Sequence, residues 1–238
     1  MDVNIVRYCS SGLTDPIAII GFPSVGLVST IIANYYVSQM EMPVVAGMSG
    51  SGMPPYCYIS GGSAYPPVRI HAHKGGSKGR DVLVCLSEYS PKPEDCYDVT
   101  MALVDYLKGE GCREVICIEG VPRFTDEDQM VICGSGHNSQ RLMNKSKLAV
   151  MSSGMVRGTT GTLLYEAIPA GIDVVAIMSP AMQNVPDPAA AAELIVPLSR
   201  LVRGLKISDK PLQAEAEEIK KRIEQSQPSK DTEYPFYG

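Results

Sequence analysis

The stretch PIAIIGFPSVGLVSTIIANYYVSQ, residues Pro16 to Gln39, decides the fold class. It starts as a continuous apolar run, turns through GFPSVG (Gly21 to Gly26), and continues as a helical pattern that Ser24 can cap. An apolar run that is continuous rather than alternating is typical of a strand covered on both faces in a parallel sheet. We therefore expect a strand, a tight turn and a helix here.

Three further apolar runs repeat this arrangement, and each is bounded by Gly, Pro or a polar residue. They are DVLVCLS (Asp81 to Ser87), EVICIEG (Glu114 to Gly120) and IDVVAIM (Ile172 to Met178). Helical patterns lie between them, over Pro93 to Leu107 and over LLYEAI, for which Thr159 or Thr160 is the expected cap. This alternation predicts the α/β fold class, as a three-layer αβα domain with a mostly parallel sheet.

Two regions depart from the simple alternation. From Pro43 to His73 the chain reads as several short strands separated by Gly and Pro, which indicates a hairpin or two added to the sheet. After the fourth apolar run, Asp187 followed by Pro188 predicts a helix start. Pro197 should kink that helix before it ends at Gly204.

A last helix is expected over about Pro211 to Gln225. Its apolar residues form a narrow seam of Leu212, Ala216, Ile219 and Ile223. A seam of this width suits packing on one partner helix, so these residues are a candidate oligomer interface; the other interpretation is a solvated helix on its own domain. The polar stretch QSQPSKDT that follows predicts a flexible tether. The expected parts are a domain over 1–207, a helix over 208–226 and a tail over 227–238.

The composition argues against several classes of partner. The chain of 238 residues is long enough to be an enzyme. Its net charge of −5 and its lack of basic runs argue against nucleic acid as a binding partner. The seven cysteines are scattered and form no C-x-x-C motif, which indicates free thiols in a reducing cytoplasm. Neither a signal peptide nor a membrane-spanning stretch is visible, so we expect a cytoplasmic protein without membrane contact.

Two glycine-containing turns have the composition of anion sites. GFPSVG lies where a dinucleotide fingerprint would sit but lacks the G-x-G-x-x-G spacing. RGTTGT, residues Arg157 to Thr162, would place backbone N–H groups, hydroxyls and an arginine at a helix N-terminus, but it lacks the lysine of a P-loop. We favour a tight packing turn for the first and a capped helix start for the second, with phosphate binding as the alternative for both.

Acidic and histidine residues near strand ends are further candidates. Glu88 and Glu119 follow presumed parallel strands, where they could act as general acid and base, bind a ribose, or serve as caps and loop anchors. His71 and His73 share one face of a strand and could hold zinc, but no third ligand lies at a recognised spacing. For the histidines we favour polar decoration of an exposed strand.

The segment CGSGHNS contains Ser135 and His137, but it does not match the G-x-S-x-G nucleophile elbow. We expect a loop that leads into a helix. No constellation in the sequence compels a reaction, so we predict no catalytic residue, no metal and no cofactor.

The chain ends in DTEYPFYG, residues Asp231 to Gly238, in a protein with no Trp and only three Phe. Pro235 stiffens the chain toward polyproline II and favours an extended Tyr234. Phe236 and Tyr237 offer apolar area with few rotors, and Gly238 presents an unhindered carboxylate. Such an end either folds back onto its own domain or docks in another protein's pocket. We favour docking, with the last five residues as the partner-binding set.

Two long stretches and this tail resemble the proteasome assembly chaperone family, in the form found in archaea. The first stretch is GFPSVGLVSTIIANYYVSQMEMPVVAGMSG with the following MPPYCYIS and YPPVRIHAH. The second is GTTGTLLYEAIPAGIDVVAIMSPAMQNVPDPAAAAELI. Together with EGVPR, Glu119 to Arg123, they cover most of residues 15 to 205. One departure is that Ile168 and Pro169 stand where a charged pair is often seen.

The resemblance implies a fold similar to nucleoside phosphorylases, without an established catalytic site, in homo-oligomers that bind the 20S proteasome core particle. Phe236, Tyr237 and Gly238 match the family's hydrophobic-Tyr-any (HbYX) docking motif position by position. In that mode the tail enters pockets between α-ring subunits, and its carboxylate pairs with a pocket lysine. The implied function is an assembly chaperone, gate-opening activator or adaptor of the proteasome. The alternative is a nucleoside- or phosphate-binding enzyme that uses Glu88, Glu119 and the RGTTGT turn.

Overall fold

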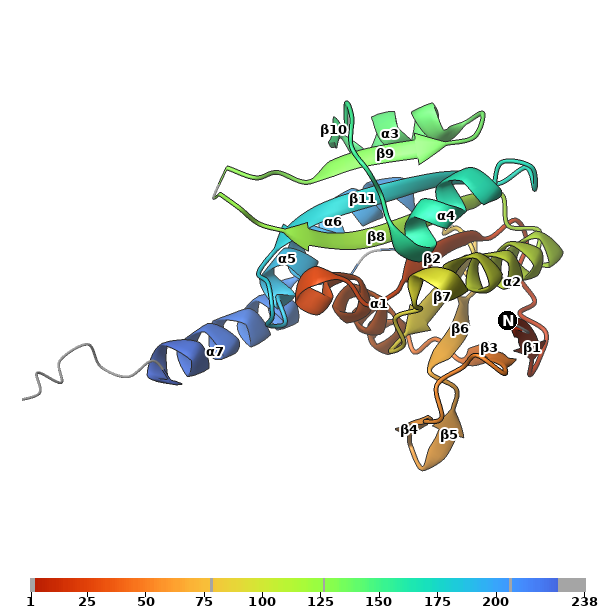
Figure 1. The fold of residues 1–238 in the computed structure, drawn as a ribbon, viewed down its shortest axis with the longest axis horizontal. Helices are drawn as coiled ribbons and strands as arrows, with labels where there is room; N and C mark the ends of the chain where they lie inside the picture. The colour runs from red at the N-terminus through yellow and green to blue at the C-terminus, as the bar shows by residue number, and fades with distance from the viewer. Residues whose placement is uncertain (1–2, 78, 126, 206, 227–238) are drawn as a thin grey trace, which may run out of the picture.

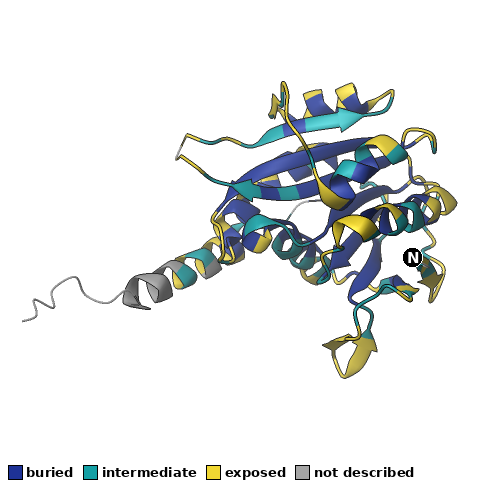
Figure 2. Ribbon diagram, viewed as in Figure 1, coloured by how far each residue is buried: buried dark blue, intermediate teal, exposed yellow. Residues whose placement is uncertain are grey.

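The structure is a computed structural model, and it describes residues 3–77, 79–125, 127–205 and 207–226. The four predicted apolar runs form its centre as neighbouring parallel strands in the order β7-β2-β8-β11 (Figure 1). These strands are β2 (Ile17–Gly21), β7 (Val82–Ser87), β8 (Glu114–Pro122) and β11 (Asp173–Ala181). Every residue of β2, β7 and β11 is buried (Figure 2). The prediction of a parallel core is confirmed, and burial on both faces explains why the runs are continuous.

Antiparallel strands extend the sheet beyond β7. The inserted region contributes β6 (Val68–His73), which pairs with β7, and β3 (Val44–Gly50), which pairs with β6. The edge strand β1 (Val3–Arg7), which the sequence did not indicate, pairs with β3. The rest of the insertion is a separate hairpin of β4 (Tyr58–Ser60) and β5 (Ser63–Tyr65) that projects from the sheet (Figure 1).

Beyond β11 the sheet continues with β9 (Val131–Ser135), antiparallel to β11, and β10 (Ala149–Val150), parallel to β9. Because β9 includes the first residues of CGSGHNS, the expected loop is wrong up to Ser135. The helix expected after it is α3 (Ser139–Ser146). Gly134 and Ser135 have little strand propensity, and pairing with β11 supplies the backbone hydrogen bonds that hold this segment as a strand.

Helices cover both faces of the sheet, which confirms the three-layer αβα architecture. Alternate strand residues feed two cores: Ile19 and Ile177 lie in one, and Ile20 and Val174 lie in the other. The first core is closed by α1, α3, α5 and α6, and the second by α2 and α4. These helices, apart from α3, have the bounds α1 (Val28–Gln39), α2 (Cys96–Gly109), α4 (Gly158–Glu166), α5 (Pro188–Glu193) and α6 (Ile195–Leu201).

Two predictions about helix ends are confirmed. Asp187 caps α5, where its Oδ1 accepts a hydrogen bond from the backbone N–H of Ala190 at 3.0 Å. Pro197 interrupts the helix that begins at Pro188, so that α5 ends at Glu193 and a second helix, α6, starts at Ile195. Because proline lacks an N–H, it cannot donate to the carbonyl four residues earlier, and the break falls at that point.

Two other predicted caps are wrong. α1 begins only at Val28, after a 3-10 turn over Val25–Leu27, and Ser24 makes no cap hydrogen bond. Thr159 and Thr160 are buried inside α4, whose cap position is taken by Arg157 without a side-chain bond. In both places the hydroxyl groups serve contacts between elements, described below.

The expected last helix is α7 (Lys210–Ser226), which packs on α5 and extends away from the sheet (Figure 1). Leu212 is only 2% exposed and belongs to the domain's own core, whereas Ala216 and Ile219 are half-buried. The side chain of Ile223 lies outside what the structure describes. The start of α7 is therefore anchored on its own domain, and self-association through the remainder of the seam stays a prediction.

The structure also bears on two compositional inferences. All seven cysteines are free thiols, and four of them are buried: Cys85, Cys96, Cys112 and Cys117. Within the described residues, no helix is both long and apolar enough to cross a membrane. The tail residues Tyr234 to Gly238 lie outside the described residues.

The anchoring of α7 predicts the result of Leu212→Ala. Removing a buried leucine side chain should lower the free energy of unfolding by about 2 to 3 kcal/mol, through lost burial and the cavity left behind. Val196→Ala is the matched control, because Val196 is 54% exposed on α6 and should change stability by less than about 0.5 kcal/mol. Urea unfolding measures both, and equal stability of the two variants would show that α7 is not anchored through Leu212.

Candidate functional site

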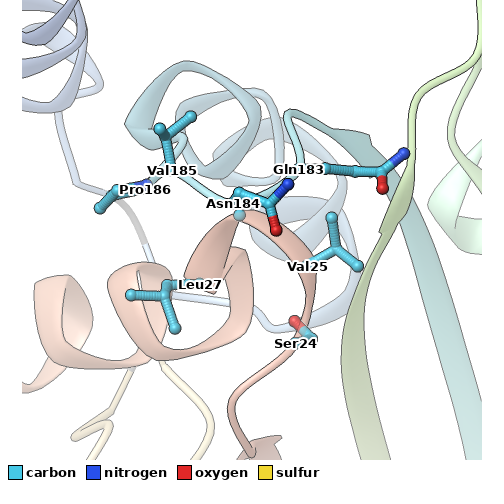
Figure 3. A pocket seen from close by; sticks show the side chains of 8 residues that line it. Ser24, Val25, Leu27, Gln183, Asn184, Val185 and Pro186 are labelled. Carbon is cyan, nitrogen blue, oxygen red and sulfur yellow. The ribbon is translucent and has the colours of Figure 1, made fainter.

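A pocket of about 470 Å³ opens at the carboxyl edge of the parallel strands, where ligands bind in open α/β sheets. One wall is the turn Ser24–Leu27 after β2, and the other is the loop Gln183–Pro186 after β11 (Figure 3). We call it the carboxyl-edge pocket. It joins two segments that are more than 150 residues apart in the sequence.

Glycines allow the first wall to approach the sheet closely. Gly26 has φ +64°, and a Cβ there would lie 2.8 Å from the Cβ of Ala181. A Cβ on Gly120 would collide with the carbonyl oxygen of Val25, so β8 needs glycine where the turn crosses it. The favoured interpretation of GFPSVG as a tight packing turn is confirmed.

A chain of hydroxyl hydrogen bonds fixes the same turn. The N–H of Gly120 donates to Ser24 Oγ at 2.9 Å, and Ser24 Oγ lies 2.7 Å from Ser29 Oγ. Ser29 donates its own proton to the carbonyl oxygen of Phe22, so Ser24 must be the donor to Ser29. This relay connects β8, the turn and α1, and it explains why the Ser24 hydroxyl is not available as a helix cap.

The second wall is fixed by Asp187. One carboxylate oxygen caps α5, and the other accepts the N–H of Met182 at 2.9 Å. The backbone N–H of Asp187 donates to the carbonyl oxygen of Gly26 at 2.8 Å, which joins the two walls. A single buried aspartate therefore sets the shape of the loop and its distance from the turn.

The chemistry of the carboxyl-edge pocket suits binding rather than proton transfer. Its side chains are apolar or amide apart from the Ser24 hydroxyl, and none of the eight lining residues is ionisable. Figure 3 shows Leu27, Val185 and Pro186 around it together with the amides of Gln183 and Asn184. Apolar contact area with a few amide donors and acceptors fits a segment of another polypeptide.

Leu27 stands out within this pocket. It is 43% exposed and has φ +51°, in the left-handed region that is strained for a branched side chain. Asn184 on the facing wall also has positive φ, at +64°, but asparagine tolerates that conformation. Backbone strain held at an exposed apolar residue is typical of binding sites.

The structure does not bring Glu88 and Glu119 into a common catalytic arrangement. Both oxygens of Glu88 accept from the Arg69 guanidinium at 2.7 Å, and this guanidinium also lies over the Tyr58 ring. Glu119 instead accepts a hydrogen bond of 2.5 Å from the hydroxyl of Thr160 on α4. Burial raises the pKa of Glu119 to about 7, although the Thr160 bond acts in the opposite direction. Neither residue lines the carboxyl-edge pocket.

The histidine and serine candidates have structural surroundings. His71 is buried in β6, so the expected exposed strand is wrong; its Nδ1 donates to the carbonyl oxygen of Met42 at 2.9 Å, and burial lowers its pKa. Among the described residues, no group of three or more His, Cys, Asp or Glu could hold a metal. Ser135 ends β9, whereas His137 is exposed in the turn before α3.

Sequence reasoning did not identify the loop Gln183–Pro186 as part of a site. The only signal was its place inside the second stretch that resembles the chaperone family, as QNVPDP. The turn GFPSVG lies in the first stretch. The two stretches that carry the resemblance thus meet at the carboxyl-edge pocket.

Fold and pocket together define a three-layer α/β domain with a non-ionic binding pocket at the carboxyl edge of its sheet. The chain belongs to the PAC2 family, whose family model matches residues 18–227.

Solved structures and one curated relative are similar over most of the chain. PbaA of Pyrococcus furiosus, described as an archaeal homolog of proteasome-assembly chaperone, is 26% identical with a TM-score of 0.79, covering 94% of this chain and 96% of its own. PbaB of the same organism, described as an archaeal proteasome activator, is 19% identical with a TM-score of 0.82, covering 95% and 99%, and shows the fold alone. An uncharacterised protein of Methanocaldococcus jannaschii is 24% identical over 89% of this chain and 85% of its own.

The strain at Leu27 predicts that Leu27→Asn stabilises the protein. Asparagine accepts the left-handed backbone, so the free energy of unfolding should rise by about 0.5 to 1 kcal/mol and the melting temperature by about 1 to 3 °C. Val196→Asn, an exposed substitution in a helical backbone, is the control and should not stabilise. If Leu27→Asn lowers the melting temperature, packing rather than binding explains the leucine.

The half-buried carboxyl of Glu119 predicts a pH dependence of stability. Its pKa rises from 4.5 to about 7 on folding, so between these values the folded state binds more protons than the unfolded state. The free energy of unfolding should therefore fall as the pH rises from about 4.5 to about 7. Glu119→Gln stays neutral and should remove this fall, making the variant more stable than the wild type at pH 8 by about 2 to 3 kcal/mol.

Urea unfolding at pH 5 and pH 8 measures the effect, with Glu193→Gln, at an exposed position on α5, as the control. Equal pH dependence of the wild type and Glu119→Gln would contradict the assignment.

Proposed function

We propose that this protein binds the 20S proteasome core particle in the cytoplasm and acts there as an assembly chaperone, a gate-opening activator or an adaptor. It docks on the α-ring through its C-terminal tail. The observation that carries this proposal is the terminal sequence Phe236-Tyr237-Gly238 on a PAC2 domain that is 26% identical to PbaA, a homolog of proteasome-assembly chaperone.

The arrangement of α7 supports a docking role for the end of the chain. Leu212 anchors the start of the helix in the domain core, and the helix then extends away from the sheet as far as Ser226 (Figure 1). Twelve residues, 227–238, follow it. A polar linker of about ten residues has an r.m.s. span near 15 to 20 Å. The motif can therefore reach a partner surface beyond the end of the helix.

The expected binding energy favours an oligomer with several tails. Burial of Phe236 contributes about 2 kcal/mol, and a charge-assisted bond from the terminal carboxylate about 1.5 to 3 kcal/mol. Ordering the tail costs roughly 0.5 to 1.5 kcal/mol for each immobilised side chain. One tail alone should therefore bind weakly, and several tails on a homo-oligomer should bind strongly by avidity.

We propose that the protein acts without catalysis. The competing enzyme hypothesis needs Glu88, Glu119 and the turn over 157–162 in one cleft. Thr160 from that turn does bond the half-buried Glu119, but Arg69 engages both oxygens of Glu88, which leaves Glu88 unavailable as the second carboxylate. The pocket at the carboxyl edge is lined by apolar, amide and hydroxyl side chains, none of them ionisable, which supports a binding function.

The tail hypothesis predicts that Tyr237→Ala, or deletion of Gly238, weakens binding to the core particle at least tenfold. The first change removes the aromatic contact, and the second moves the carboxylate. A pull-down with purified core particle measures binding, and native mass spectrometry of the same samples checks the oligomer.

Two controls sharpen this experiment. Tyr165→Ala removes an exposed tyrosine from α4 and should leave binding unchanged. Addition of one residue after Gly238 keeps every side chain but displaces the carboxylate, so it should act like the deletion. Undiminished binding by Tyr237→Ala and by the deletion would overturn the proposed docking mode.

A further inference from the structure

A second pocket, of about 590 Å³, lies at the opposite edge of the sheet, where the parallel strands begin. Four basic side chains line it: Arg80 before β7, Arg141 and Lys145 on α3, and Arg203 after α6. We call it the amino-edge pocket. Its basic residues come from three separate parts of a chain whose net charge is −5, so their convergence is a property of the fold.

Three carboxylates share this pocket, and two of them are already engaged. Glu114, at the start of β8, is 5% exposed and pairs with both Arg80 and Arg141. Asp81 accepts the backbone N–H groups of Thr14 at 2.7 Å and Gly75 at 2.9 Å.

The third carboxylate, Asp15, contributes little to neutralising the pocket. Its side chain is 62% exposed and lies 3.5 Å from the Arg80 guanidinium. An exposed pair of this kind is worth little because water screens it. The hydrogen bonds of Asp81 come from neutral backbone groups and leave its negative charge in place. The four basic side chains therefore exceed the three carboxylates by one unit of charge, so the lining of the pocket is net positive.

Lys145 and Arg203 are the two basic side chains of the pocket that form no ion pair among the described residues. Lys145 uses one of its three protons on the carbonyl oxygen of Leu201, at 2.8 Å. Burial lowers the pKa of Lys145, and the neighbouring Arg141, Arg80 and Arg203 lower it further. Glu114 raises this pKa, but the lowering effects are larger. Arg203 is exposed and has no ion pair within the described part of the chain. Like charges held together in this way repel one another.

We propose that the amino-edge pocket binds a small phosphate-bearing anion between Arg141, Lys145 and Arg203. Guanidinium groups present planar, paired donors that match phosphate oxygens, and an ammonium adds a compact point charge. The three side chains have unused N–H donors, and the bound anion relieves their mutual repulsion. Asp15, Asp81 and Glu114 on the remaining wall disfavour an extended acidic chain and limit the ligand to a compact anion.

The proposal is tested by thermal unfolding of the full chain in sodium pyrophosphate, with sodium chloride used to hold the ionic strength constant. A ligand that binds only the folded state raises the melting temperature in a saturable way. The test variant is Lys145→Gln with Arg203→Gln. The control is Lys92→Gln with Lys108→Gln, which removes the same charge from exposed positions elsewhere. Sodium citrate is the carboxylate comparison.

We expect a saturable rise for the wild type and the control, and an apparent affinity at least tenfold weaker for the test variant. Each rise is measured from the variant's own melting temperature without pyrophosphate, because Lys145→Gln also loses the hydrogen bond to Leu201. The proposal is overturned if the wild type shows no saturable rise, or if the two variants bind alike. It is also overturned if citrate matches pyrophosphate, which would remove the phosphate assignment.

Discussion

The architecture depends on the close crossing of the GFPSVG turn over β8. A side chain at Gly120 would occupy the place of the Val25 carbonyl oxygen, so the turn lies against bare backbone. The N–H of Gly120 then starts the hydroxyl relay through Ser24 and Ser29 that directs the chain into α1. A buried N–H without a partner is costly, so the N–H of Gly120 needs the Ser24 oxygen that the crossing turn brings to it. One wall of the carboxyl-edge pocket is a consequence of this crossing.

The central fold could be predicted because its signals are local. Strands β2, β7, β8 and β11 are buried on both faces, and such burial leaves continuous apolar runs in the sequence. The edges could not be predicted in this way, since β1, β9 and β10 contain exposed or half-buried residues and depend on their neighbours for hydrogen bonds. The same distinction applies to the predicted helix caps. Asp187 caps its own helix, so its role is local and could be predicted. The hydroxyls of Ser24 and Thr160 bond to other elements, which no local pattern reveals.

The candidate site was only partly accessible to sequence reasoning, for a geometric reason. GFPSVG was identified as a turn of interest, but its partner loop Gln183–Pro186 meets it only through the sheet topology. Ionisable residues considered one at a time were misleading, because they suggested free or exposed groups that the structure does not contain. In the sequence Glu88 has the pattern of a free carboxylate, but in the structure Arg69 bonds both of its oxygens. The sequence likewise suggests an exposed His71, whereas β6 lies inside the sheet and buries it. The meaning of an ionisable residue is set by its partners, which are distant in sequence.

The pocket and the base of the tail share one structural element. Asp187 fixes the loop of the carboxyl-edge pocket through Met182 and joins it to Gly26, and the same side chain caps α5. α7 packs on α5 and buries Leu212 in the core that α5 helps to close. A shift of the pocket loop would therefore act on the helix that carries the anchor of α7. The docking proposed for the tail would gain from a fixed starting point, and this short connection through Asp187 and α5 supplies one from the centre of the domain.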